Sequence, residues 1–349
     1  MNTTEIPSIK FPSSQISAPR ILVPYYHREG SRICCEICPA KCLLDEGEIG
    51  VCGGRQVIDG DLIAVNYAQV CSLQLDSIEK KPLYHFFPGS EILSVGPNGC
   101  NLSCDWCLNW KITQNVAPTR TVMPVDLADM VDALDGIGVA YTYAEPLIWY
   151  EYVMDAGRIL QERGLVNIFI SNGYISPQPL RDIMTIADAF NIDLKADNDA
   201  CYSSHCGGRL EDVQRTIRMV LEAGKHLEIS HLMVSGVNDD FHKLEKLVDW
   251  LYTLDHKIPL HLKRYSPAYK HDAPTTSTDF LLKAFEIAKA KLEYVYLGND
   301  TTPESKDSFC PNCRNLLIKR RDFGVEVLGL ERDNCKGCGL GLPFVVDME

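Results

Sequence analysis

Residues 91–107, EILSVGPNGCNLSCDWC, join an apolar strand-like run to a loop that carries three cysteines at C-x3-C-x2-C spacing. Gly99 allows a tight backbone just before the first thiol. Three thiolates at this spacing can bind three corners of a four-iron cube, which normally takes four cysteine ligands. The fourth iron would keep an open coordination position, as catalytic metal sites do. A structural zinc ion is the alternative, but it requires a fourth ligand that the local segment lacks.

Strand-like and helix-like segments alternate from Glu91 to Asn299. Apolar runs predict strands at 91–96, 137–143, 165–171, 189–194, 227–234, 259–265 and 293–297. Helical periodicity is clearest at 147–163, 209–223, 241–254 and 279–291. This alternation predicts an α/β fold, and the number of repeats favours a partial (β/α) barrel. Functional side chains are then expected on the loops that follow the strands.

Composition excludes several classes of protein. The 349 residues carry a formal net charge of −13, which argues against binding to nucleic acid or to anionic membranes. The chain shows no apolar run long enough for a membrane span and no signal-peptide pattern, so we expect a cytoplasmic protein. Fifteen cysteines is an odd number, and in a reducing compartment clustered thiols bind metal more often than they pair.

Two further groups of cysteines flank the predicted barrel. The N-terminal cysteine group consists of Cys35, Cys38, Cys42 and Cys52, with Cys34 as a spare thiol, and the C-terminal cysteine group consists of Cys310, Cys313, Cys335 and Cys338. The two C-x2-C pairs of the C-terminal group predict a zinc ribbon, with rubredoxin-like iron as the rival. The N-terminal group indicates either a second zinc site or an auxiliary iron–sulfur cluster, and the residue types leave both open.

These features predict four parts of the chain. We expect a flexible arm over 1–30, a cysteine-rich module with flanking strands over 31–90, the barrel over 91–300 and the four-cysteine ribbon over 301–349.

Three motifs fall at the ends of predicted strands: Tyr143-Ala-Glu-Pro146, Ser171-Asn-Gly173 and Asp193-Leu-Lys195. Together with the C-x3-C-x2-C loop, they resemble the radical S-adenosylmethionine (SAM) superfamily, in its branch like the pyruvate formate-lyase activating enzyme. A finer similarity is to the radical SAM enzyme of the AmmeMemoRadiSam system. It is carried by the stretches CEICPAKC, GVCGGR, IEKKPLYHFFPGS, NIDLKA, CGGRLEDV and the terminal CPNC and CKGCG. The resemblance covers roughly Cys35 to Pro343.

This resemblance implies a [4Fe–4S] cluster on Cys100, Cys104 and Cys107 that binds SAM. Reductive cleavage of SAM would give a 5′-deoxyadenosyl radical that abstracts hydrogen from an unidentified substrate. The implied partners are a low-potential electron donor of the flavodoxin or ferredoxin type and Memo-like and AMMECR-like proteins.

The resemblance also implies which side chains contact SAM. Glu145 would lie near the methionyl amine, Lys195 would meet the SAM carboxylate, and the remaining implied contacts are Ser171, Asn172 and Asp193. Polar residues at strand ends also commonly cap the next helix, which is the alternative role. Ala144 stands where the family usually has asparagine.

Two other functions remain open at this point. The chain would serve as an activase if its substrate were a glycyl-radical enzyme. It would be a metal-binding scaffold without turnover if the cysteines held only structural metal.

Overall fold

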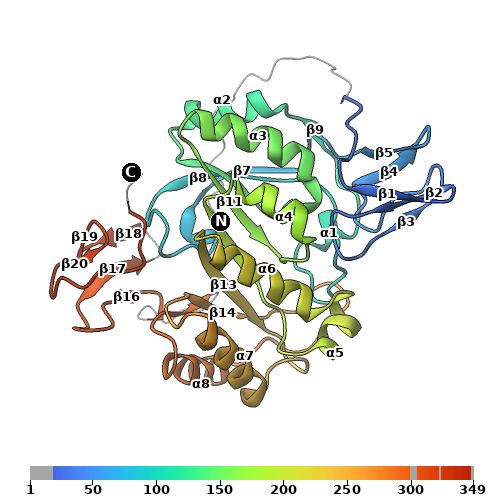
Figure 1. Ribbon diagram of the computed structural model, residues 1–349. Coiled ribbons are helices and arrows are strands. Elements are labelled where there is room, and N and C mark those ends of the chain that lie inside the picture. Colours follow the sequence, from blue (N-terminus) through green and yellow to red (C-terminus); the bar gives the residue numbers. More distant parts are fainter. Residues whose placement is uncertain (1–18, 299–304, 322–323, 347–349) are drawn as a thin grey trace. The chain divides into compact units, whose positions relative to one another are not determined.

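The computed structural model describes residues 19–298, 305–321 and 324–346 (Figure 1). The chain forms two compact units. The first takes in the chain up to Asp76, Glu91–Ser103 and Asn109–Asp188, and the second takes in Ser77–Ser90, Cys104–Leu108 and the chain from Ala189 onward. Residues 1–18 of the expected arm lie outside the described part.

Parallel strands form the centre of the first unit. In spatial order they are β8 (Glu91–Gly96), β10 (Gly138–Tyr141) and β11 (Val166–Ser171), and β7 (Ser72–Ser77) lies beside β8. The short helix η2 (Pro146–Trp149) leads into α3 (Tyr150–Glu162), which packs on β10 and β11 next to α2 (Pro124–Leu134) and α4 (Pro177–Met184) (Figure 1). The strands are apolar along most of their length because helices cover them.

The N-terminal part of the first unit consists of short antiparallel strands. They are β1 (Tyr26–Glu29), β2 (Arg32–Cys35), β3 (Leu43–Leu44), β4 (Arg55–Ile58), β5 (Asp61–Ala64) and β6 (Gln69–Val70), which pairs with β9 (Arg120–Thr121). Asp59 and Gly60 connect β4 to β5, and both have positive φ angles, 52° and 76°. An Asp-Gly pair suits this two-residue turn, because its backbone twist matches that of the hairpin. Helix α1 (Trp110–Thr113) also belongs to this unit.

Parallel strands also form the centre of the second unit. These are β12 (Ala189–Asp193), β13 (His226–Met233), β14 (Leu260–Arg264) and β15 (Val295–Gly298), in that spatial order. The helices between them are α5 (Asp199–Cys201), the π-helical turn η3 (Tyr202–Cys206), α6 (Leu210–Glu222), α7 (Phe241–Leu254) and α8 (Thr278–Lys289). Val213, Ile217 and Val220 are fully buried on one face of α6, as its helical periodicity predicts.

A buried carboxylate on β13 joins several segments of the second unit. Glu228 is fully buried, and its oxygens lie 3.0 Å from His226 Nε2 and 2.6 Å from His261 Nε2. It also accepts hydrogen bonds from the backbone N–H groups of Tyr84 and His85. These residues follow the short helix η1 (Ile78–Lys80). His261 is therefore part of the buried core of this unit.

The C-terminal module is a small antiparallel arrangement in the second unit. Its strands are β16 (Ser308–Phe309), β17 (Leu316–Arg321), β18 (Gly324–Val327), β19 (Leu330–Glu331) and β20 (Asn334–Cys335). Its core includes Tyr84, Tyr294 and Phe344, and the His85 ring stacks on Phe344 at 3.9 Å between centroids. The alternation of parallel strands with helices and this small module confirm the predicted α/β class with a zinc-ribbon-like C-terminus. Among the described residues, no helix is both long and apolar enough to cross a membrane.

Candidate functional site

The ends of β10 and β11 bring three of the predicted SAM-contacting residues together. Glu145 is 2% exposed, and its Oε1 accepts a hydrogen bond from Ser171 Oγ at 2.8 Å. Its Oε2 accepts one from the Asn172 backbone N–H, also at 2.8 Å. Glu145 additionally caps η2, because Oε1 accepts the Leu147 N–H at 3.0 Å. The capping role and the clustering of polar groups therefore occur together at this carboxylate.

Asn172 extends this group to the first cysteine of the central loop. Its Nδ2 lies 3.5 Å from Cys100 Sγ and 2.9 Å from Asn101 Oδ1. Its Oδ1 accepts the Tyr174 N–H at 2.8 Å, which fixes the amide orientation. A hydrogen bond to sulfur favours the thiolate form and tunes a metal bound to it. The side chain of Asn172 thus suits a cysteine that ligates iron.

Backbone geometry places this loop tightly against its surroundings. Gly99 has φ +98°, and a Cβ atom there would lie 2.0 Å from the carbonyl oxygen of Cys52. Tyr143, just before Ala144 and Glu145, has φ +70°, which is rare for a residue with a side chain. Its hydroxyl donates to Asp76 Oδ2 at 2.7 Å, which helps to hold that conformation. Backbone outliers of this kind cluster at functional sites.

In the second unit, Asp193 and Lys195 form an ion pair at the end of β12. Lys195 Nζ lies 3.4 Å from Asp193 Oδ2. Burial alone would raise the pKa of Asp193, but the charges of Lys195 and Lys263 lower it below its usual value. Burial would likewise lower the pKa of Lys195, but Asp193 and the Cys104 thiol raise it well above its usual value. Both groups are therefore charged at neutral pH, as recognition of the charged ends of an amino acid requires.

Cys104, the second cysteine of the loop, lies beside Cys206. A hydrogen bond from the Cys206 thiol lowers the pKa of the Cys104 thiol, against the effect of burial. Cys206 is fully buried in the π-helical turn after β12. Its hydrogen bond to Cys104 places Cys206 next to a candidate ligand of iron.

His205 and Lys270 contribute contacts that sequence reasoning missed. The His205 ring lies 3.0 Å from Asp105 Oδ2, and its carbonyl accepts the Asp105 N–H at 3.0 Å. The Lys270 N–H donates to the Asp105 carbonyl at 2.9 Å. These bonds anchor the segment with Cys104 and Cys107 within the second unit. The only local signal was the position of His205 next to Cys206 in a loop after a predicted strand.

The C-terminal cysteine group is assembled as a metal site. Its four sulfur atoms all lie within 4.8 Å of one another, with 3.7 Å between Cys310 and Cys338 and 3.6 Å between Cys313 and Cys335. Four sulfurs at tetrahedral positions about 2.3 Å from one zinc ion stand about 3.8 Å apart. The donor set and its spacing therefore fit a single tetrahedral ion.

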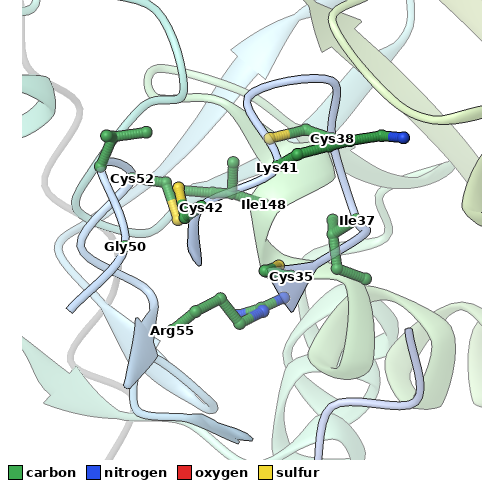
Figure 2. Close-up of a pocket in the computed structure, with 10 residues that line it drawn as sticks. Cys35, Ile37, Cys38, Lys41, Cys42, Gly50, Cys52, Arg55 and Ile148 are labelled. Carbon is green, nitrogen blue, oxygen red and sulfur yellow. The ribbon is translucent and has the colours of Figure 1, made fainter. Parts of the chain in front are cut away.

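The N-terminal cysteine group lines a pocket of the first unit. Figure 2 shows Cys35, Cys38, Cys42 and Cys52 around this space, together with Arg55. Burial raises the pKa of the Cys35 thiol to about 12, and also raises that of Cys52. Cys34 is not among the lining residues: its thiol contacts the Lys41 carbonyl at 3.7 Å.

The sequence profile of the radical SAM superfamily matches residues 95–251. The chain is 37% identical over 330 residues to the uncharacterized protein MJ0808 of Methanocaldococcus jannaschii, covering 92% of this chain and 98% of that protein.

Two solved structures are similar over part of the chain. A domain of pyruvate-formate lyase-activating enzyme from Bacteroides vulgatus is 23% identical, with 47% of this chain and 100% of that chain covered and a TM-score of 0.42. A radical SAM methyltransferase from Sphaerobacter thermophilus is 19% identical, with 60% and 66% covered and a TM-score of 0.48. A radical SAM domain implies a [4Fe–4S] cluster and SAM, and the donors beside Cys100 and Cys104 fit thiolate ligands. Residues 95–251 thus form a radical SAM superfamily domain, and the chain belongs to one family with the Methanocaldococcus protein.

Proposed function

We propose that this protein is an enzyme that cleaves SAM reductively and uses the resulting 5′-deoxyadenosyl radical to abstract hydrogen from a substrate. The observation that carries the proposal is the hydrogen-bonded group of Glu145, Ser171 and Asn172, which reaches Cys100 through the Asn172 amide. When bound, the cluster supplies the electron that breaks the carbon–sulfur bond of SAM. The chain supplies the ligands, the charged contacts and the positioning.

The proposed ligands of this cluster are the thiolates of Cys100, Cys104 and Cys107, at the spacing that leaves one iron open. Asn172 and Cys206 donate hydrogen bonds toward Cys100 and Cys104 and thereby favour their thiolate forms.

The side chains that we propose to contact SAM include both an acidic and a basic residue. Glu145 stabilises the methionyl ammonium of SAM. Ser171 and Asn172 hold the Glu145 carboxylate in place. Lys195 pairs with the SAM carboxylate, while Asp193 keeps Lys195 charged and oriented. The Glu145 carboxylate is already buried and held in one orientation. It therefore loses little rotational freedom when SAM binds, which favours affinity.

The rest of the assignment rests on the sequence, through its composition, its cysteine spacing and its resemblance to the AmmeMemoRadiSam enzyme. We propose a zinc ion on the C-terminal cysteine group, a flavodoxin or ferredoxin type electron donor, and a cytoplasmic protein that works in the AmmeMemoRadiSam system with Memo-like and AMMECR-like partners. The four-part division at residues 30, 90 and 300 is proposed on the same basis. The net charge of −13 supports the expectation that nucleic acid is not a partner.

The direct test is anaerobic reconstitution with iron and sulfide, reduction with dithionite and measurement of 5′-deoxyadenosine formed from SAM. We expect formation by the wild type and loss of nearly all of it in Cys104→Ala. The matched control is Cys71→Ser, whose side chain contacts the Gly96 carbonyl and Ser72 in the first unit. Equal product from wild type and Cys104→Ala, or none from either, would refute the proposal. A glycyl radical on a co-incubated glycyl-radical enzyme would identify the activase as the specific function.

A further inference from the structure

The N-terminal cysteine group differs from the C-terminal group in how its sulfurs are spaced. Among the described residues, the C-terminal four come within 4.8 Å of one another, whereas no three sulfurs of the N-terminal four do. The N-terminal four instead surround a pocket (Figure 2). Thiolates that share one zinc ion must stand about 3.8 Å apart. In a four-iron cube each thiolate binds a different iron at a separate corner, so the sulfurs stand further apart.

An unpartnered donor lines the same pocket. Arg55 is 1% exposed, and its terminal nitrogens bond Glu151 Oε2 at 2.7 Å and Asn66 Oδ1 at 3.1 Å. Its Nε is buried and has no hydrogen-bond partner within the part of the chain that the structure describes. A buried N–H without a partner is costly and calls for an acceptor. The thiolates of a metal site can accept such a bond, and an iron–sulfur cluster adds bridging sulfides, which are acceptors that a zinc site lacks.

The pocket also lies against the loop that carries Cys100. The Cys52 carbonyl occupies the place of a side chain at Gly99. On the other side, the Asn101 side chain hydrogen-bonds the Cys38 thiol, and Asn101 is in turn bonded to Asn172, which reaches Cys100 Sγ. Contacts between side chains therefore run from the N-terminal cysteine group to the first ligand of the SAM cluster, all within the first unit.

We propose that Cys35, Cys38, Cys42 and Cys52 bind a second iron–sulfur cluster, with Arg55 Nε donating a hydrogen bond to one of its sulfurs. This proposal goes beyond the cleavage of SAM and does not depend on it. A redox-active centre at this position is placed to carry single electrons from a low-potential protein donor to the neighbouring loop.

The test compares metal and acid-labile sulfide in three anaerobically reconstituted full-length proteins. These are the wild type, the triple variant Cys100→Ala/Cys104→Ala/Cys107→Ala, and the double variant Cys38→Ser/Cys42→Ser. We expect each variant to lose about half of the iron and sulfide, because each lacks one of two clusters. Zinc stays at one per chain in all three. The triple variant, which leaves the pocket intact, should give a paramagnetic resonance signal after reduction with dithionite.

The control is Cys34→Ser, since Cys34 is buried beside the group but does not line the pocket. It should keep wild-type iron, sulfide and zinc. A triple variant with no iron, or a double variant that loses zinc rather than iron, would overturn the proposal. If the wild type fails to cleave SAM but the triple variant keeps its iron and sulfide, only the proposed function fails.

Discussion

Glu145 is a buried carboxylate with donors on both oxygens, and its charge is the part of it that SAM would recognise. Glu145→Gln removes that charge while keeping the size of the side chain. A hydrogen bond to a charged group contributes about 2 kcal/mol, so we expect roughly 30-fold weaker SAM binding. Calorimetry on the anaerobically reconstituted protein measures this. Glu162→Gln, at the exposed end of α3, is the matched control, and unchanged affinity in Glu145→Gln would remove Glu145 from the site.

Gly99 permits a comparison between two glycines of the same backbone type. Gly99→Ala would place a methyl group 2.0 Å from the Cys52 carbonyl oxygen at φ +98°. Gly164→Ala has the same sign of φ, +71°, with nothing within 4 Å of the added atom. Both substitutions carry the cost of the backbone conformation, about 1 kcal/mol, and only the first adds a clash with backbone.

We therefore expect Gly99→Ala to lower the unfolding temperature more than Gly164→Ala and to reduce iron incorporation. Thermal unfolding and iron analysis of the two variants measure the difference. Equal effects would mean that the loop tolerates displacement from Cys52.

Strand β13 carries a pH-dependent element of the fold, the buried group around Glu228. Burial lowers the pKa of His85 to about 3, and burial also lowers that of His261. Below about pH 6.5 the unfolded chain takes up protons that these buried histidines do not, so stability falls as pH falls. Each such proton contributes a slope of about 1.4 kcal/mol per pH unit.

His85→Gln should reduce the slope of the unfolding free energy against pH between pH 6 and pH 5. The reduction corresponds to about one proton fewer taken up on unfolding. Urea unfolding in zinc-saturated buffer measures it. The matched control is His242→Gln, at an exposed position of α7. A wild-type slope retained in His85→Gln would mean that His85 takes up its proton in the folded protein.

The elements were predictable to different degrees. Strand β8 coincides with the predicted 91–96, and helix α7 with the predicted 241–254, because apolar periodicity is a local property of the sequence. The contact of Gly99 with Cys52 and that of Cys104 with Cys206 join segments far apart in the chain, so no periodicity marks them. Arg55 ends the stretch GVCGGR, but that stretch does not predict its role, because the role depends on a pocket that only the folded chain forms.

For the molecule as a whole, the metal content measures which of the fifteen cysteines bind iron and which bind zinc. Cys310 is fully buried in the core of the C-terminal module, next to Tyr294 and Leu330. Zinc on this group would stabilise that core, since structural zinc contributes to folding directly. Cys338→Ser should release one zinc per chain and lower the unfolding temperature by at least about 5 °C.

Zinc analysis by mass spectrometry and thermal unfolding check this expectation. Cys71→Ser should keep its zinc, because Cys71 lies outside all three cysteine groups. Iron instead of zinc in the wild-type module would make it a rubredoxin-like site.

The contact between the Cys52 carbonyl and Gly99 also has an evolutionary consequence. The N-terminal cysteine segment and the central loop are far apart in sequence, yet neither can shift without the other. The intervening residues can gain or lose length, whereas these two segments must be inherited together. A homologue that only replaces Cys52 keeps the backbone carbonyl and still requires glycine at position 99, whereas a homologue that lacks the whole segment loses this steric requirement.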